Sequence, residues 1–166
     1  MTAAGPNPPL VADGWTMRRA SSADYDAVVR LQRAAFAPNR ERLGVAPLPL
    51  LADYRQVLRD KDVWLATETK RGKEVVIGVL VLERRAEDLM IESIATDPKV
   101  QRRGLGRAML AAAEAQTKEL GYTVMRLYTG VVLTDLVEWY GRHGFSIERV
   151  EVLSDRSVTH MMKRIA

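Results

Sequence analysis

Residues 97–107 form a basic, glycine-containing segment whose residue types suit the binding of a phosphate group. The segment follows an apolar run at 89–96 and leads into a helical pattern from Gly104 to about Leu120. Where a strand enters a helix through such a loop, the first-turn N–H groups have no intrahelical partner, and the helix dipole adds partial positive charge. Gly104 and Gly106 let the backbone approach a phosphate closely, because neither carries a Cβ. Arginines there add forked donors that match phosphate oxygens, so the segment is predicted to bind a pyrophosphate.

The spacing of these residues excludes two common phosphate-binding motifs. A dinucleotide fingerprint requires a small residue three positions after Gly106, and that position is Met109. A triphosphate loop requires Gly-Lys-Ser/Thr, which the sequence does not contain. The sequence instead has Gln-x-x-Gly-x-Gly, with Gln101 as its first residue. Taken alone, this motif is also compatible with an ordinary basic loop that caps a helix.

Glu92 is the second candidate for chemistry, because it lies in an otherwise apolar strand. A carboxylate in such a strand must be solvated, paired or functional. Strand alternation predicts that Met90, Glu92 and Ile94 share one face. If that face lines a cleft, partial desolvation raises the carboxyl pKa towards a value useful for a general base. A structural ion pair with Arg84 or Arg126 is the alternative.

Composition restricts the class of protein. The chain has 166 residues, 47% of them hydrophobic and 28% charged, which is typical of one globular domain. No apolar run reaches the roughly 18 residues that a membrane helix needs, so no membrane association is expected. The absence of cysteine excludes disulfides and thiolate metal sites and fits a cytoplasmic protein, and two distant histidines predict no metal site. Residues 1–13 lack the features of a secretory signal and are predicted to form a disordered leader.

The elements that position these residues follow from periodicity and turn signals. We expect a strand at 15–20, a helix from Ser21 or Ser22 to about Pro38, a loop at 39–49 and a helix from Leu50 to about Arg59. Three strands at 63–68, 75–83 and 89–96 form an antiparallel meander. The helix after the phosphate loop connects to a strand at 123–129, which demands a right-handed crossover and a parallel pair. A short helix at 135–142 and a final hairpin complete an α/β (α+β) fold, a mixed, mostly antiparallel seven-stranded sheet with helices on both faces.

This element order and two motifs resemble the GNAT (GCN5-related) N-acetyltransferase family. Gln101, Gly104 and Gly106 match the family's Gln/Arg-x-x-Gly-x-Gly/Ala signature after a strand. Residues 139–145, Trp-Tyr-Gly-Arg-His-Gly-Phe, are similar to its Leu-Tyr-x-x-x-Gly-Phe. The resemblance implies one GNAT domain over residues 14–166. One position departs from the pattern: Leu133 stands where the family often has an asparagine that contacts the pantetheine arm, and Thr134 or Asp135 could take that contact.

The resemblance implies direct transfer of an acetyl group from acetyl-CoA to a primary amine of a small molecule or peptide. Tyr140 is then the general acid for the departing thiolate, with packing as its alternative role. Glu92 is the candidate base, Tyr128 and Glu83 are reserves, and deprotonation through water stays open. The residues expected to bind the cofactor, several of them through the main chain, are Ile94, Ala95, Thr96, Gln101, Arg102, Arg103, Gly104, Leu105, Gly106, Arg107 and Thr134.

The sequence does not identify the amine acceptor. The residues that select the acceptor are expected in the 39–49 loop and the last hairpin. Arg40 and Arg42 in that loop either meet an acidic acceptor or solvate the loop. A net charge of +4 is spread along the chain, so nucleic acid is not the expected partner, although aminoacyl-tRNA is an alternative acceptor. A non-catalytic acyl-CoA sensor is the other alternative to an enzyme. Whether the chain forms a homodimer stays open.

Three further residues have expected structural roles: His143 at the surface, Phe145 in the core and His160 on the last strand.

Overall fold

The computed structural model describes residues 14–100 and 104–166. The strands are β1 (Thr16–Arg19), β2 (Asp62–Lys70), β3 (Lys73–Arg84), β4 (Leu89–Thr96), β5 (Val124–Gly130), β6 (Ser146–Val152) and β7 (Ser157–Arg164). The helices are α1 (Tyr25–Leu43), α2 (Leu48–Leu51), α3 (Tyr54–Asp60), α4 (Leu105–Glu119) and α5 (Thr134–Arg142), with 3-10 turns η1 (Ser22–Asp24) and η2 (Pro98–Val100). The predicted leader at 1–13 and the predicted ligand contacts of Gln101, Arg102 and Arg103 lie outside the described residues.

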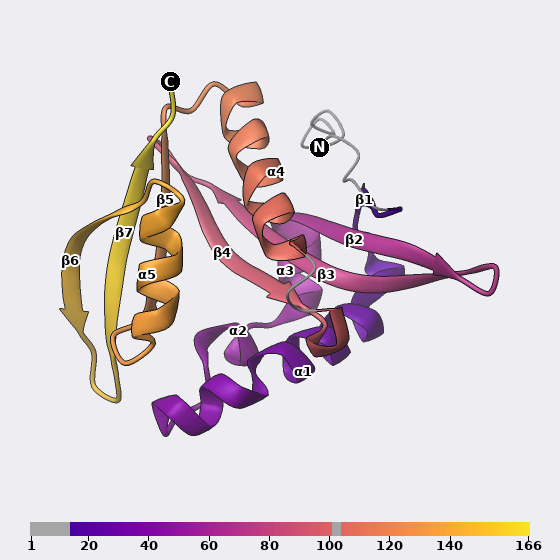
Figure 1. Cartoon of the computed structure of the whole chain (residues 1–166), viewed down its shortest axis with the longest axis horizontal. Helices are drawn as coiled ribbons and strands as arrows, with labels where there is room; N and C mark the ends of the chain where they lie inside the picture. Colours follow the sequence, from indigo (N-terminus) through magenta and orange to yellow (C-terminus); the bar gives the residue numbers. More distant parts are fainter. Residues whose placement is uncertain (1–13, 101–103) are drawn as a thin grey trace.

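All seven strands form one sheet in the order β1-β2-β3-β4-β5-β7-β6 (Figure 1). β4 and β5 are parallel, and every other neighbouring pair is antiparallel. Helix α4 makes the crossover between the two parallel strands. The predicted fold class, a mostly antiparallel mixed sheet with one parallel crossover, is confirmed.

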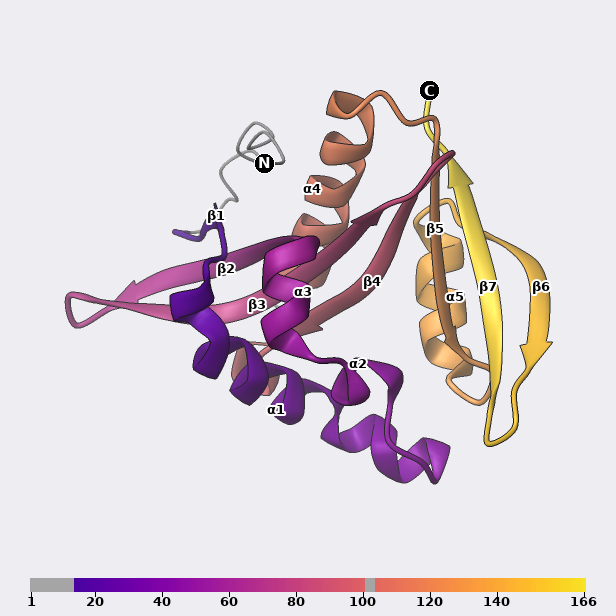
Figure 2. The same cartoon turned by 180° about the vertical axis from the view of Figure 1, so that it is seen from behind.

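Helices cover both faces of the sheet, as Figures 1 and 2 show from opposite sides. On one face α1 and α3 bury Val28, Leu31 and Val57 against β3 residues such as Val79. On the other, α4 buries a stripe that includes Met109, completely inaccessible to solvent. Such one-sided apolar stripes are what hold an amphipathic helix on a sheet. The packing therefore fixes both ends of the segment that links β4 to α4.

The region between α1 and α3 differs from the prediction, which ended the first helix near Pro38. Helix α1 continues through Pro38 to Leu43 and ends at Gly44, whose φ of 72° is left-handed. Tertiary packing outweighs the proline here, because Leu43 lies against Gly130 so closely that a Cβ on that glycine would meet the leucine side chain at 2.6 Å. The predicted second helix is also wrong as a single element. It divides into α2 and α3, because Asp53 caps α3 by accepting a hydrogen bond from the Arg55 N–H at 3.0 Å.

The parallel strands β4 and β5 stay together for only a short distance. Their pairing runs from Leu89 opposite Met125 to Ile91 opposite Leu127. Beyond that point β4 is paired only with β3, and β5 only with β7. The sheet therefore opens between the carboxyl ends of two parallel strands, which is where open α/β sheets hold ligands.

Candidate active site in the opening of the sheet

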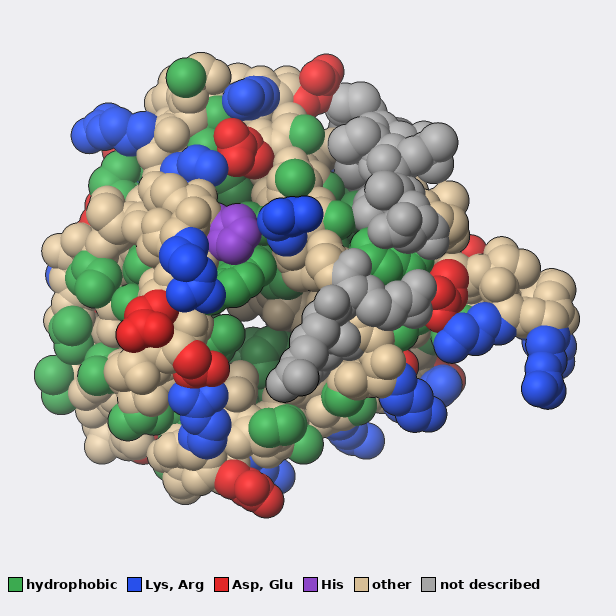
Figure 3. All heavy atoms as spheres, viewed as in Figure 1, with side chains coloured by type: hydrophobic (Ala, Val, Ile, Leu, Met, Phe, Trp, Pro, Cys, Tyr) green, Lys and Arg blue, Asp and Glu red, His purple; other side chains and the backbone are tan. Residues whose placement is uncertain are grey.

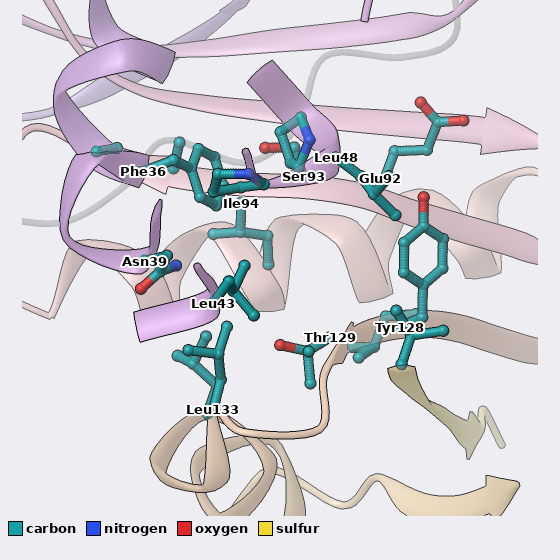
Figure 4. Close-up of a pocket in the computed structure, with 18 of the residues that line it drawn as sticks. Phe36, Asn39, Leu43, Leu48, Glu92, Ser93, Ile94, Tyr128, Thr129 and Leu133 are labelled. Atoms are coloured by element: carbon teal, nitrogen blue, oxygen red, sulfur yellow. The ribbon is translucent and has the colours of Figure 1, made fainter. Parts of the chain in front are cut away.

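A cavity of about 360 Å³ fills the opening between β4 and β5. Its walls come from the end of α1, α2, β4, β5, the start of α5 and the turn between β6 and β7. Figure 4 shows side chains from these elements converging on it, and the space-filling view is hollowed between α4 and α5 (Figure 3). A concave site with a few polar groups among apolar ones is the usual form of a small-molecule site.

The exposed edge of β4 forms one wall. Ile94, Ala95 and Thr96 line the cavity and pair on their other side with Leu80, Val79 and Gly78 of β3. Within the described residues, no strand pairs with the β5-facing edge of this segment. A free strand edge can receive an extended ligand that carries amides. The Asp97 N–H donates to the Ile77 carbonyl of β3 at 2.8 Å, and main-chain groups alternate between the two edges of a strand, so those of Ile94 and Thr96 face the free edge and those of Ala95 face β3.

The amino end of α4 provides the second set of main-chain donors. Gly104, at φ 79°, precedes the helix, and its carbonyl accepts the first helical bond from the Ala108 N–H at 3.1 Å. The N–H groups of Leu105, Gly106 and Arg107 therefore precede the helical ladder. The Leu105 side chain is buried and that of Arg107 is exposed, so for Leu105 only the amide can reach a ligand. This arrangement has the unpaired first-turn amides that an anion site requires, and the pyrophosphate contact itself stays a prediction.

Glu92 occupies a bulge in β4, which the sequence did not predict. Val81 pairs with Ser93 and Leu82 with Ile91, so Glu92 is an extra residue without an opposite partner. The bulge shifts the alternation of side chains, and the predicted common face for Met90, Glu92 and Ile94 is wrong. Ile94 packs with Ile91 on the α4 side, whereas Ser93 turns to the α1 side.

The ion-pair partner of Glu92 is Lys61, at the end of α3. The two predicted partners are engaged elsewhere: Arg84 with Asp62 at 2.6 Å, and Arg126 with Asp88 at 2.6 Å. Lys61 lies 31 residues before Glu92 and carries no motif, so no local signal could have identified it.

The proposed base and its two reserves lie together. Burial raises the pKa of the Glu92 carboxyl, the neighbouring Glu83 carboxyl raises it further, and the Lys61 ammonium opposes both. Burial also raises the pKa of Tyr128, and the charges of Glu92 and Glu83 add to that effect. Figure 4 shows the Tyr128 hydroxyl pointing towards the Glu92 side chain. His160 packs on Tyr128 with ring centroids 5.7 Å apart, which is the structural role that was expected of it.

Tyr140 reaches the cavity from α5. Its ring makes edge contacts with Trp139 at 5.0 Å and with Phe145 at 5.7 Å between centroids. Burial raises its pKa to about 12, so the phenol keeps its proton at neutral pH. Phe145 is buried, as predicted. His143 is half-buried rather than superficial, because its ring lies 4.4 Å from that of Trp139.

The start of α5 does not bring Thr134 into the cavity. Leu133, which is buried, lines the cavity, and so does Asp135, but Thr134 is exposed beside them. Asp135 is bonded to Arg42 of α1 at 2.5 Å, so Arg42 does not simply solvate a loop. Of the two predicted replacements for the missing asparagine, one points elsewhere and the other already has a cationic partner.

The α1–α2 wall is fixed by a small buried polar network. The Gln32 amide donates to the Tyr54 hydroxyl at 2.9 Å and to Ser93 Oγ at 3.1 Å, and the Tyr54 hydroxyl donates to the Pro49 carbonyl at 2.5 Å. This network joins the wall to β4 directly beside Glu92. Since buried polar groups with satisfied bonds specify one arrangement, the wall is held in register with the strand.

Two further properties concern residues 14–100 and 104–166. Across them, no helix combines the length and the apolar character needed to cross a membrane. The same residues contain no cluster of three or more acidic or histidine side chains arranged to hold a metal ion.

Comparisons with known proteins identify the kind of fold and family. Residues 25–145 match the sequence model of the Acetyltransferase (GNAT) family. No curated protein sequence matches the chain at a significant level. The chain is similar in structure to the PaiA N-acetyltransferase of Thermoplasma acidophilum in complex with coenzyme A, with 16% identity over 92% of this chain and 99% of the other and a TM-score of 0.73.

Two other solved structures show the same fold. One is the ribosomal-protein-S18-alanine N-acetyltransferase of Escherichia coli, at 18% identity over 92% of this chain and 94% of the other, with a TM-score of 0.68. The second is a GNAT family acetyltransferase of Elizabethkingia anophelis with acetyl-CoA bound, at 17% identity over 92% of this chain and 99% of the other, with a TM-score of 0.64.

Proposed function

The chain belongs to the GNAT family of acetyltransferases, and from this premise we propose that it transfers an acetyl group from acetyl-CoA to a primary amine of a small molecule or peptide. The observation that carries the proposal is the parting of β4 from β5 after Ile91, which leaves a strand edge free beside the cavity. The first-turn amides of α4, which have no partner in the helical ladder, come next in the chain after β4 and η2.

The residues present fit an acyl-CoA. The amides of Leu105, Gly106 and Arg107 would hold its diphosphate, since each is a first-turn donor. The free edge of β4 would pair with the amides of its pantetheine arm. When bound, the thioester supplies an activated acetyl group. The N–H of Ile94, which faces the free edge, would then donate to the carbonyl oxygen, whose negative charge grows during attack.

The proton transfers are assigned to two side chains that line the cavity. Glu92, whose raised pKa brings it closer to that of an amine, would accept the proton of the attacking ammonium, directly or through water. Tyr140 would donate to the departing thiolate, because its phenol is protonated across the neutral range. Direct transfer between the two bound substrates needs no nucleophile from the protein.

The test separates binding from turnover. We expect acetyl-CoA to raise the melting temperature, because a ligand at 100 times its Kd stabilises the native state by about 2.7 kcal/mol. NADH, a different diphosphate ligand, serves as the control for unspecific anion binding. We also expect thiol release in a panel of primary amines, amino acids, peptides and aminoacyl-tRNA. Binding of acetyl-CoA without thiol release across the panel would favour a sensor, and no thermal shift would contradict the proposed site.

A further inference from the structure

Arg156 places a buried positive charge in the wall of the cavity, and the proposed function gives it no role. We propose that the amine acceptor also carries a carboxylate, which Arg156 binds, so that the substrate class is a small amino acid or related amino-carboxylate. This inference rests on the proposed acetyl transfer and specifies its acceptor.

The position of Arg156 is unusual for an arginine. It lies in the turn between β6 and β7, yet only 7% of its side chain is exposed, and it lines the same cavity as Glu92 and Tyr128. Arginine stays protonated at all physiological pH values, so burial cannot neutralise it. A buried charge costs free energy unless it is paired and hydrogen-bonded.

The protein satisfies the Arg156 guanidinium only in part. Its Nε and Nη2 donate to the two carboxylate oxygens of Asp155 at 3.1 and 3.0 Å, and its Nη1 donates to the Ala46 carbonyl at 2.6 Å. A guanidinium has five N–H donors, so two have no acceptor among the described residues. Asp155 is 53% exposed, and solvent therefore screens its charge. The cavity keeps a net positive group with two free donors, which suits one carboxylate.

The opposite charge lies elsewhere in the cavity wall. Glu92, with Glu83 beside it and Lys61 as ion-pair partner, would receive the ammonium of the acceptor, since two carboxylates there exceed the one lysine charge. Tyr128 lies close enough to both the carboxylates and Arg156 to sense their charges: Glu92 and Glu83 raise its pKa, and Arg156 lowers it. A molecule with an amine and a carboxylate is therefore complementary to the two ends of this wall. A cavity of about 360 Å³ is near the lower limit for ligand sites, which favours a small acceptor.

The hydrogen bond from Arg156 to Ala46 connects the proposed carboxylate site to the α1–α2 wall of the cavity. Ala46 belongs to the connection between α1 and α2, and Tyr54 holds the following α2 through the Pro49 carbonyl. Arg156 thus joins the last hairpin to that wall across the cavity. This second, tethering role makes a simple loss-of-activity experiment ambiguous, so the test must compare acceptors.

The experiment measures kcat/KM by thiol release for matched acceptors: alanine, ethylamine and alaninamide, and phenylalanine, phenethylamine and phenylalaninamide. Rates are expressed per unprotonated amine, because the amine pKa differs within each set. We expect kcat/KM for each amino acid to be at least ten times that for its decarboxylated amine and for its amide. Arg156→Gln should reduce this ratio of kcat/KM values to near one. Arg156→Lys keeps the positive charge but not the paired guanidinium donors, so it should give an intermediate ratio. Arg149→Gln, an exposed arginine on β6, is the matched control and should keep the wild-type ratio.

Several outcomes would overturn the inference. In a purely tethering role, Arg156→Gln would lower kcat/KM for all three members of each set by one factor and leave their ratios unchanged. A preference for the amine or the amide would exclude a carboxylate site but leave the acetyltransferase proposal intact. If no amino acid is acetylated, the inference fails, and acetyl-CoA binding with thiol release from other amines decides whether the proposed function fails too. Stabilisation of the CoA-bound protein by N-acetylalanine, but not by N-ethylacetamide, checks the site without turnover.

Discussion

Replacing Tyr140 with phenylalanine tests whether a half-buried phenol in the cavity wall can serve as the general acid. The substitution removes one hydroxyl and keeps the edge contacts of the ring with Trp139 and Phe145. Among the described residues the Tyr140 side chain has no hydrogen-bonding partner, so the protein itself loses no bond. We therefore expect little change in stability or in the Kd of acetyl-CoA, and the effect should fall on kcat.

The raised pKa limits how large that effect can be. Taking about 8.5 for an alkyl thiol, complete proton transfer from a phenol of pKa about 12 is uphill by about 3.5 units, or roughly 5 kcal/mol. In the proposed reaction Tyr140 would therefore act mainly as a hydrogen-bond donor to the developing thiolate. General acids contribute about 10²- to 10⁴-fold, and this mismatch favours the lower limit. We expect Tyr140→Phe to reduce kcat about 100-fold.

The pH dependence gives the sharper test. At pH 9 only about 0.1% of a phenol with a pKa near 12 is ionised. The ratio of wild-type to Tyr140→Phe kcat should therefore be constant between pH 6 and 10. Tyr122→Phe is the matched control, since its hydroxyl donates to the Arg85 carbonyl at 2.8 Å outside the cavity, and it should leave kcat unchanged. A ratio that falls with an inflection near pH 9, or equal losses in kcat and acetyl-CoA affinity, would refute the reasoning.

Three further predictions concern the base, the packing and the acid stability. Lys61→Met removes the charge that lowers the pKa of Glu92, so the rising limb of the kcat/KM–pH profile should move to higher pH; an unmoved limb would exclude Glu92 as the base. Gly78→Ala would place a Cβ 2.7 Å from the sulfur of fully buried Met109, so urea denaturation should show a loss of about 1–3 kcal/mol, and Met109→Ala should cost less in the Gly78→Ala background than in wild type; equal costs would exclude the clash. Two arginines hold the pKa of Asp88 below its usual range, so the stabilisation is present above the unfolded pKa of about 3.9 and is lost as the pH falls through the folded value. Melting curves should therefore show the advantage of wild type over Asp88→Asn shrinking below about pH 4, and an advantage that does not depend on pH would contradict this account.

Local sequence signals were sufficient for the order of elements and for the glycine-led start of α4, where phosphate binding stays a prediction. Gly104 adopts the left-handed conformation that its place before a helix requires, and Gly106 and Arg107 follow in the first turn. Tyr140 was identified by a motif within one helix. These features depend on residues within one or two turns of each other, so periodicity and composition contain the necessary information.

Contacts between distant segments decided the features that the sequence did not reveal. The continuation of α1 past Pro38 depends on Leu43 packing on Gly130, 87 positions later in the sequence. The pairing of Glu92 with Lys61 depends on where α3 ends relative to β4. Propensity and periodicity describe a residue's own neighbours in the chain, so they cannot report such contacts.

The bulge at Glu92 explains how β4 can lose one strand neighbour and still hold its edge rigidly. The extra residue lies immediately after Ile91, where the pairing with β5 ends. Beyond it, Ser93 is anchored on the α1 side by Gln32, whereas Ile94 packs on the α4 side. Pairing with β3 continues to Thr96, so the segment is fixed along one edge and on both faces. Only the edge that faces the cavity is left free, and its amides are therefore oriented before a ligand arrives. Donors fixed in advance need no reorganisation when charge develops, which is the property that an acyl-transfer site requires.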